Sequence, residues 1–270
     1  MVTNIHQFPG LTLYQHAVAS TLGTQIPHAA GAAYALKMKA KENPTTPPAI
    51  AVAYFGDGAA SEGDFHGALN MAACRDCPVI FICRNNGFAI STPTSEQYRG
   101  DGIASRAIGY GIDALRVDGT DIFAVYEATK EARRRALEGG GRPILLEFMS
   151  YRVSHHSTSD DSFAYRTRGE VETWKTRDNP ITRLRKWLEN RKLWDSDKEA
   201  CTRASIRKAV LEELAAAEGE KKPALANIFV DVYKELTEEA AEQRQELKRL
   251  MLKFPGEYDV AMHEGGIEGL

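Results

Sequence analysis

Gly56-Asp57-Gly58 and Asn85-Asn86 combine residue types that suit the binding of a diphosphate with Mg²⁺. Mg²⁺ prefers near-octahedral oxygen coordination and takes only one or two carboxylates, while phosphates and water complete its shell. Asp57, the side-chain oxygen of Asn86 and one main-chain carbonyl after it would suffice as protein ligands. Glycines beside Asp57 would let the backbone approach the ligand closely. Taken alone, however, Gly-Asp-Gly after a strand is more often a structural turn.

The surrounding sequence predicts a strand-helix-strand unit that would bring the two segments together. Residues 49–55 and 78–83 are continuous apolar runs, as expected for strands buried on both faces of a parallel sheet. Residues 60–74 between them have an apolar helical face and acidic residues near their start. Such crossovers are right-handed, so the loops after both strands open at the sheet edge where α/β folds bind ligands. Arg84 would offer this edge a second phosphate contact.

The rest of the chain predicts a doubly wound, mostly parallel α/β sheet followed by a helical tail. Strands are expected at 113–117 and 143–148, and helices at 24–42 and 122–137. From about Glu170 the pattern is helical and charged, and the tail's expected helical segments are 180–184, 198–218 and 224–252.

The composition of the chain argues against nucleic acid, a membrane or a zinc ion as a binding partner. The net charge of -3 leaves no basic footprint for nucleic acid. No apolar run approaches the roughly 18 residues needed to cross a bilayer, so a membrane partner is not expected. Cys74 and Cys77 have C-x-x-C spacing, but the sequence has no second Cys pair and no His pair at zinc spacing. A structural interpretation of these cysteines is therefore favoured.

A long polar stretch at residues 151–167 contains two adjacent histidines, His155 and His156. A loop of this length is usually functional or disordered. Adjacent histidines on a loop are on composition alone more often incidental than catalytic, although histidine titrates near neutrality and can exchange protons. Arg152 and Asp160 would order the loop if they form a charge-assisted pair, and a plain solvated face is an equal alternative.

Longer strings around these motifs resemble a known family. GDGAASEGD at 56–64 and RNNGFAIST at 84–92 strongly resemble the thiamin-diphosphate motif of 2-oxo acid dehydrogenase E1 α subunits. Residues 92–102 and 155–162 are similar to the branched-chain members of that family, the second segment most specifically. The resemblance runs from about Ala19 to about Trp194 and continues more loosely through the tail.

The resemblance implies a thiamin-diphosphate-binding fold in three regions. Residues 1–18 are unmatched, residues 19–168 form the α/β domain, and residues 169–270 are a helical C-terminal extension. Family members have a substantial segment before the helix that opens here at Thr24, so we expect a truncated chain or an incomplete gene model. A mitochondrial-matrix location is implied by the resemblance, and the chain shows no transit peptide.

The resemblance also implies roles for individual residues. The implied cofactor contacts are Ser20, Leu22, Asp57, Gly58, Ala59, Arg84, Asn86 and His156. The implied Mg²⁺ ligands are Asp57, Asn86 and the main-chain carbonyl of Phe88. A structural K⁺ would fall at Thr24 and Gln25, where neighbouring positions Ala19 and Thr21 depart from the family pattern.

We call residues 151–167 the histidine loop. In this loop the resemblance gives His156 the catalytic role of proton transfer at the cofactor and in acyl transfer to a lipoyl group. Ser157 matches a regulatory phosphorylation position. The second such position falls on Thr167, a residue that departs from the family pattern.

The implied activity is oxidative decarboxylation of branched-chain 2-oxo acids with acyl transfer to lipoyl-E2. The implied enzyme is an α2β2 heterotetramer in which the β subunit supplies the glutamate that activates the aminopyrimidine. Two alternatives are a truncated, non-catalytic α chain that binds the β subunit, and a pyruvate or acetoin E1 α subunit.

Overall fold

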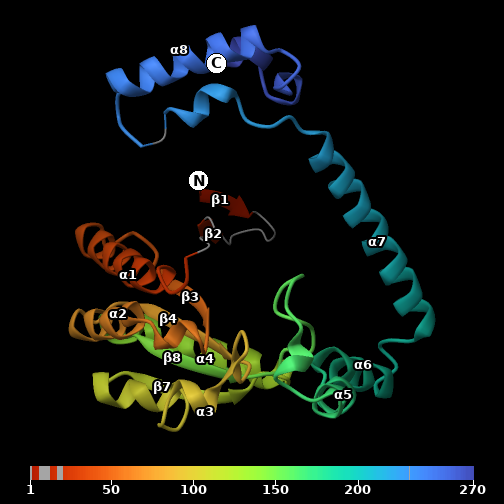
Figure 1. The fold of residues 1–270 in the computed structure, drawn as a ribbon. Helices are drawn as coiled ribbons and strands as arrows, with labels where there is room; N and C mark the ends of the chain where they lie inside the picture. The colour runs from red at the N-terminus through yellow and green to blue at the C-terminus, as the bar shows by residue number, and fades with distance from the viewer. Residues whose placement is uncertain (1, 6–12, 17–20, 231) are drawn as a thin grey trace. The chain divides into compact units, whose positions relative to one another are not determined.

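The computed structural model describes residues 2–5, 13–16, 21–230 and 232–270. The chain divides into two compact units, Met1–Leu193 and Trp194–Leu270 (Figure 1). The three regions expected from the family resemblance, with bounds at 18/19 and 168/169, are a different kind of division, and they stay a prediction.

A four-stranded parallel sheet forms the centre of the first unit. Its order is β3-β4-β8-β7, with β3 at Ala51–Gly56, β4 at Val79–Asn85, β8 at Ile144–Met149 and β7 at Asp113–Asp118. All three strand pairings are parallel. The predicted α/β fold with a parallel sheet is therefore confirmed, and the carboxyl ends of all four strands meet at one edge.

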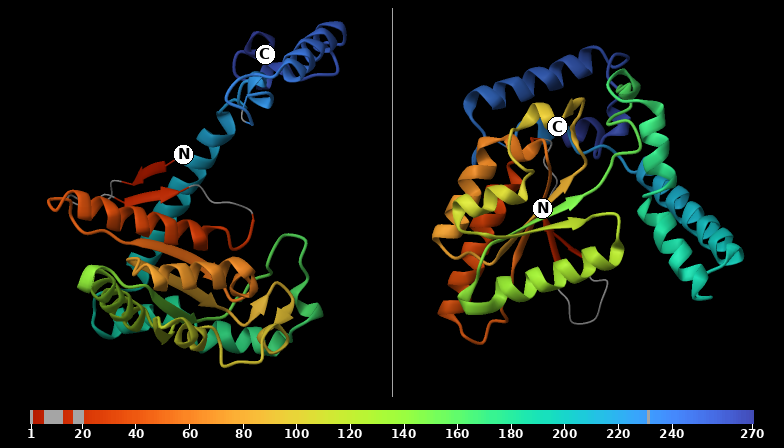
Figure 2. Two further views of the ribbon diagram at one scale, coloured as in Figure 1. Left: turned by 90° about the vertical axis from the view of Figure 1, so that its left-hand side faces the viewer. Right: turned by 90° about the horizontal axis from the view of Figure 1, so that it is seen from below.

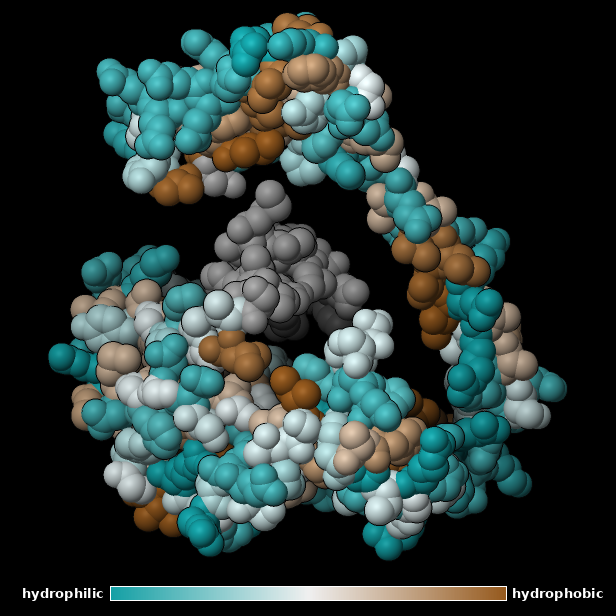
Figure 3. Space-filling view, in the orientation of Figure 1, coloured by the Kyte–Doolittle hydropathy of each residue, from teal (hydrophilic) through white to brown (hydrophobic). Residues whose placement is uncertain are grey.

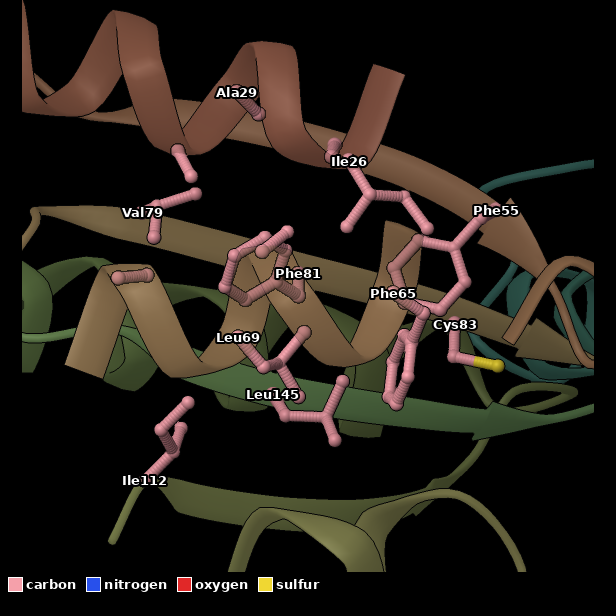
Figure 4. Packing of buried hydrophobic residues seen from close by; sticks show 14 of the residues in the cluster. Ile26, Ala29, Phe55, Phe65, Leu69, Val79, Phe81, Cys83, Ile112 and Leu145 are labelled. Atoms are coloured by element: carbon pink, nitrogen blue, oxygen red, sulfur yellow. The ribbon is translucent and has the colours of Figure 1, made fainter. Parts of the chain in front are cut away.

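Helices cover both faces of this sheet, as the apolar runs predict for buried strands (Figure 2). On one face α1 (Gln25–Glu42) and α2 (Gly63–Cys74) share a core with alternate residues of β4, including Phe81 (Figure 4). On the other face α4 (Ile122–Leu137) packs against the intervening β4 residues, including Ile82. The alternation along β4 is the period of two expected of a strand.

The helix predicted at 60–74 is divided at its start. Ala59–Ser61 form a 3₁₀ turn, Glu62 has an extended backbone, and α2 begins at Gly63. The break places a separate turn, with Ala59 and Ala60 buried, directly after the Asp57 loop.

Between β4 and β7 the chain forms short elements that periodicity does not predict. These are β5 (Phe88–Ala89), β6 (Thr92–Pro93), α3 (Thr94–Gln97) and a 3₁₀ segment, Ala104–Tyr110. After β8 the chain continues through α5 (Arg168–Thr176) and α6 (Pro180–Asn190). Near the N-terminus β1 (Val2–Ile5) pairs antiparallel with β2 (Leu13–His16).

The second unit contains α7 (Ser196–Gly219) and α8 (Glu238–Lys253), with a small core of Leu225, Met251 and Leu270. Apolar side chains lie exposed along α7 (Figure 3). The prediction of one helical segment over 224–252 is wrong, because the described residues between Ile228 and Thr237 are not helical. Val230, Val232 and Tyr233 in this stretch are poor helix formers, and the Thr237 side chain caps a new helix.

Among the described residues, none of the helices is both long enough and apolar enough to cross a membrane.

Candidate functional site

Asp57 lies in the loop after β3 and is only 1% exposed. One carboxylate oxygen, Oδ1, accepts a hydrogen bond of 3.2 Å from the Asn86 N–H. The other, Oδ2, accepts one of 2.9 Å from Nε2 of Gln97. The structure therefore brings together the two loops whose sequences suggest a metal-bound diphosphate.

Asn85 and Asn86 have different environments although they are adjacent. Asn85 is buried, and its Nδ2 donates to Oε1 of Glu147 at 2.8 Å and to the Tyr98 hydroxyl at 3.3 Å. Asn86 is half-buried, and its Oδ1 accepts from the Phe88 N–H at 3.1 Å. An amide oxygen has two lone pairs, so Asn86 Oδ1 retains one for a cation. Asn85 instead fastens the loop to the sheet.

Glu147, in the middle of β8, is a buried residue that was not predicted from the sequence. It is 0% exposed and accepts hydrogen bonds from Asn85, the Ile103 N–H (3.0 Å), the Ala104 N–H (2.8 Å) and Arg116 Nε (2.9 Å). Burial raises the pKa of Glu147, but the hydrogen bonds outweigh burial and hold the pKa below its ordinary value. The signal in the sequence was a single acid within an apolar run.

Gly58 forms a close backbone contact that a side chain would prevent. A Cβ built at Gly58 would lie 2.7 Å from the Cβ of Ala89 in β5. The loop after β3 and the β5–β6 hairpin are thus closely packed, with buried Ala59 following. A glycine at position 58 is therefore required by the contact with Ala89, which holds the two segments together.

The donor set at this edge suits Mg²⁺ rather than a transition metal. Among the described parts of the chain, no three His, Cys, Asp or Glu side chains gather as a metal-binding group. A cation beside Asp57 would therefore use one carboxylate together with amide and main-chain oxygens, phosphate and water. That is the coordination Mg²⁺ prefers, so the residues fit a magnesium diphosphate.

Arg84 lies at the end of β4, opposite Gly56 in the strand register, and is exposed. It points to the face of the sheet opposite Asn85, since neighbouring strand residues alternate. Arg84 is therefore at the predicted edge with its charge accessible to solvent.

The upstream predicted contacts are only partly described. Ser20 lies outside the described residues, and Leu22 is 69% exposed. The Thr24 hydroxyl donates to the Thr21 carbonyl at 3.4 Å, and Gln25 Nε2 donates to the Tyr54 carbonyl at 2.9 Å. Gln25 thus ties the start of α1 to strand β3, while the role of Thr24 and Gln25 in K⁺ binding stays a prediction.

The histidine loop leaves the same sheet edge. Ser150, directly before the loop, donates its N–H to the Asn85 carbonyl at 2.8 Å. Arg152 then donates from Nη2 to the Ile90 carbonyl, in the turn of the β5–β6 hairpin, at 2.7 Å. The loop is therefore attached to the segment that contacts Gly58.

Arg166 organises the interior of this loop and was also missed from the sequence. It is buried and donates to the carbonyls of Arg152 and Ser154 and to the hydroxyl of Ser162, the last two at 2.8 and 2.9 Å. Nδ1 of His155 accepts from the Ser162 N–H at 3.1 Å, so a neutral His155 carries its proton on Nε2. No pattern in the sequence separates Arg166 from the other arginines nearby.

Arg152 and Asp160 do not form the direct pair offered by the sequence. The Tyr165 hydroxyl stands between them: it accepts from Arg152 Nη2 at 2.7 Å and donates to Asp160 Oδ2 at 2.8 Å. Asp160 Oδ2 also accepts from the His156 N–H at 2.8 Å, and this hydrogen bond is the main reason that the pKa of Asp160 is lowered. The His156 backbone is thereby held while its side chain stays exposed.

The two predicted phosphorylation positions differ in environment. Ser157 is exposed, with its hydroxyl 3.3 Å from that of Ser159. Thr167 is the N-cap of α5, where its hydroxyl accepts from the Glu170 N–H at 3.2 Å.

Comparisons with known proteins agree with the motifs. The model of a family described as dehydrogenase E1 component matches residues 15–226. The mitochondrial 2-oxoisovalerate dehydrogenase subunit alpha of Mus musculus is 53% identical over 241 residues, which cover 89% of this chain and 53% of that protein. For the Homo sapiens protein of the same name the identity is 52%, with the same coverage.

A plant relative is similar over the same length. The mitochondrial 2-oxoisovalerate dehydrogenase subunit alpha 2 of Arabidopsis thaliana is 48% identical, over 89% of this chain and 50% of that protein. The chain thus spans about half the length of the curated relatives it matches.

Proposed function

Since this chain belongs to the dehydrogenase E1 component family, we propose that it acts as the α subunit of a branched-chain 2-oxo acid dehydrogenase. The reaction would be that of 3-methyl-2-oxobutanoate dehydrogenase (2-methylpropanoyl-transferring), in branched-chain amino acid catabolism. The relatives' names favour this substrate class over pyruvate and acetoin. Those names also support a mitochondrial location, for which we propose the matrix.

The observation that carries the proposal is the hydrogen-bonded contact of buried Asp57 with the Asn86 loop, beside the origin of the histidine loop. Asp57, the Asn86 side chain and the Phe88 carbonyl would hold Mg²⁺. The diphosphate would be bound by the main-chain N–H groups of Gly58 and Ala59 and by the guanidinium of Arg84, since all of these groups favour an anion. Bound thiamin diphosphate would supply the carbanion chemistry needed for decarboxylation.

His156 would move a proton during acyl transfer to the lipoyl group. Its exposed side chain supports this role because the lipoyl group arrives from another protein. The hydrogen bond from its N–H to Asp160 would hold the residue in place without occupying the imidazole.

The remaining contacts belong to the same proposal. Ser20 and Leu22 would contact the aminopyrimidine, and Thr24 with Gln25 would bind K⁺. A β subunit in an α2β2 assembly would supply the activating glutamate, and a lipoyl-bearing E2 would accept the acyl group. Phosphate on exposed Ser157 would add charge beside His156, and phosphate on Thr167 would alter the cap of α5.

Co-expression with a β subunit tests the proposal. The complex should release CO₂ from 2-oxoisovalerate, faster than from pyruvate, when Mg²⁺ and thiamin diphosphate are supplied. His156→Ala should abolish acyl transfer to lipoyl-E2, whereas His28→Ala, at an exposed histidine of α1, should not. A complex that forms but releases no CO₂ would instead identify a non-catalytic α chain.

A further inference from the structure

Gln97 reaches the proposed metal site because the chain after β4 folds back on itself. The β5–β6 hairpin reverses direction, and the Thr94 N–H donates to the Gly87 carbonyl at 3.0 Å as α3 begins. Gln97, the last residue of α3, is thereby brought against Asp57 from 40 positions further along the chain. The short elements between β4 and β7 thus return a side chain to the end of β3.

The Gln97 amide is fixed by two acceptors. Its Nε2 donates to Asp57 Oδ2 at 2.9 Å and to the Thr92 carbonyl at 3.0 Å. Both N–H groups are therefore used, which sets the orientation of the amide. Its Oε1 is buried without a hydrogen-bond partner among the described residues. The two acceptors, Asp57 Oδ2 and the Thr92 carbonyl, thus orient the Gln97 amide, and its side-chain partner is the Asp57 carboxylate.

Asp57 retains capacity for a cation in this arrangement. A carboxylate has about four lone-pair positions, and Asp57 uses one on the Asn86 N–H and one on Gln97. The two hydrogen bonds approach different oxygens, so they restrain rotation of the carboxylate, and as far as the described residues go each oxygen keeps a free lone pair.

The neighbouring residues make α3 a firm support. The hydroxyl of Tyr98 accepts from Asn85, which is bound to buried Glu147. The guanidinium of Arg106 lies 4.9 Å from the centroid of the Tyr98 ring and donates to the Ala60 carbonyl at 2.6 Å. The position of Gln97 is therefore linked both to the sheet and to the turn that follows Asp57.

We propose that Gln97 is a positioning residue of the metal site, which orients the Asp57 carboxylate for Mg²⁺ without binding the ion. The proposal rests on the proposed function, since that function supplies the ion and the diphosphate. Partners that hydrogen-bond metal ligands set ligand orientation, and their loss typically lowers metal affinity about 10–100-fold. A purely structural link between α3 and the loop after β3 would affect folding but not the Mg²⁺ requirement.

Titration of Mg²⁺ into the complex with its β subunit, at saturating thiamin diphosphate, distinguishes these roles. Gln97→Met removes the donor and keeps the length of the side chain. We expect the apparent Kd for Mg²⁺, measured by calorimetry, to rise about 10–100-fold and excess Mg²⁺ to restore full cofactor binding. Gln243→Met is the matched control, because Gln243 also faces a carboxylate, Glu239 at 3.5 Å, but on the exposed surface of α8.

Gln97→Asn is a second variant, which keeps the amide but is too short to reach Asp57 if the backbone stays in place. If Gln97→Met does not fold, the Mg²⁺ titration of Gln97→Asn tests whether Gln97 positions Asp57. An apparent Kd within about twofold of wild type in the folded variant would overturn the role of Gln97, since loss of such a partner typically costs at least tenfold. So would a loss of cofactor binding that excess Mg²⁺ does not restore. If the wild-type complex itself shows no Mg²⁺-dependent binding of thiamin diphosphate, the proposed function fails and this inference fails with it.

Discussion

Two polar regions leave the same edge of the sheet and are built in opposite ways. Near the proposed diphosphate edge, where β3 and β4 end, the buried charges are carboxylates, Asp57 in the loop after β3 and Glu147 in β8, and N–H groups converge on them. In the histidine loop the buried charge is a guanidinium, Arg166, and main-chain carbonyls converge on it. One region fixes acceptors and the other fixes the path of a loop.

The difference also concerns the residues proposed to do the chemistry. Asp57 is buried and pre-oriented, as stabilisation of a charged ligand requires. His156 is exposed, and among the described residues its backbone N–H makes its one hydrogen bond, as would suit the proposed encounter with a second protein. We therefore expect mutations at the diphosphate edge to lower global stability and mutations in the histidine loop to act locally.

Glu147→Leu should have the largest effect on stability. It would leave the Ile103 and Ala104 N–H groups and Asn85 without their shared acceptor and Arg116 without its buried partner. We expect the free energy of unfolding to fall by about 3 kcal/mol. Urea denaturation followed by circular dichroism measures it.

Glu131→Leu is the matched control for Glu147→Leu. Glu131 lies in α4 and pairs with Arg134 and Arg135 where the partners are solvent-exposed, so its loss should matter far less. Equal losses for the two variants would contradict the contrast between a buried and an accessible carboxylate.

Arg166→Met should release the histidine loop. Hydrogen bonds to a charged group contribute about 1.5–3 kcal/mol each, so we expect cleavage within residues 151–165 by a protease to accelerate at least about tenfold. Arg177→Met is the control, because exposed Arg177 follows α5 and pairs with Asp178 outside the loop. The global free energy of unfolding should change less than in Glu147→Leu. A larger change in Arg166→Met would contradict the expectation that mutations in the histidine loop act locally.

Acid should loosen the histidine loop through Asp160. The His156 N–H holds the pKa of Asp160 below its ordinary value, so the carboxylate stabilises the loop above that ordinary value, and this contribution is lost as pH falls through the lower, folded-state pKa. Hydrogen-exchange protection of the His156 amide should therefore be steady from about pH 7 to about pH 5 and fall only below about pH 4. In Asp160→Asn that acid-dependent fall should be absent.

The smallest effects are expected at the two proposed phosphorylation positions. Thr167→Ala removes the cap of α5 and should cost about 1 kcal/mol. Ser157→Ala removes an exposed hydroxyl and should stay within about 0.5 kcal/mol. Thermal unfolding of both variants separates the two values, and a Ser157→Ala loss as large as that of Thr167→Ala would show that the Ser157 hydroxyl has a structural role.

The parallel sheet and the contact between Asp57 and the Asn86 loop could be predicted because parallel topology brings the ends of neighbouring strands together. Glu147 could have been found as an isolated acid in the apolar run at 144–148. Gln97 and Arg166 could not, because their partners are set by the path of irregular segments rather than by a period.

The error in the tail has a local physical cause. The helix-like spacing of residues 224–252 predicted one continuous helix. That prediction gave too little weight to the β-branched residues Val230 and Val232, which disfavour a helix, and to Thr237, which caps a new one. Thr237 stands directly before two acids, Glu238 and Glu239, and a threonine in that position is itself a helix-start signal. The break before α8 could therefore have been predicted from the sequence.

Calorimetric titration of thiamin diphosphate into the complex of this chain with a β subunit, with and without Mg²⁺, tests most directly whether this chain supplies the diphosphate end of the site. We predict Mg²⁺-dependent binding that Asp57→Asn weakens by at least the roughly 10–100-fold expected for loss of a residue that only orients a ligand. Asp76→Asn, at an exposed turn with φ 47°, should leave it unchanged. Binding that needs no Mg²⁺, or that survives Asp57→Asn at full strength, would show that this chain does not supply the diphosphate end of the site.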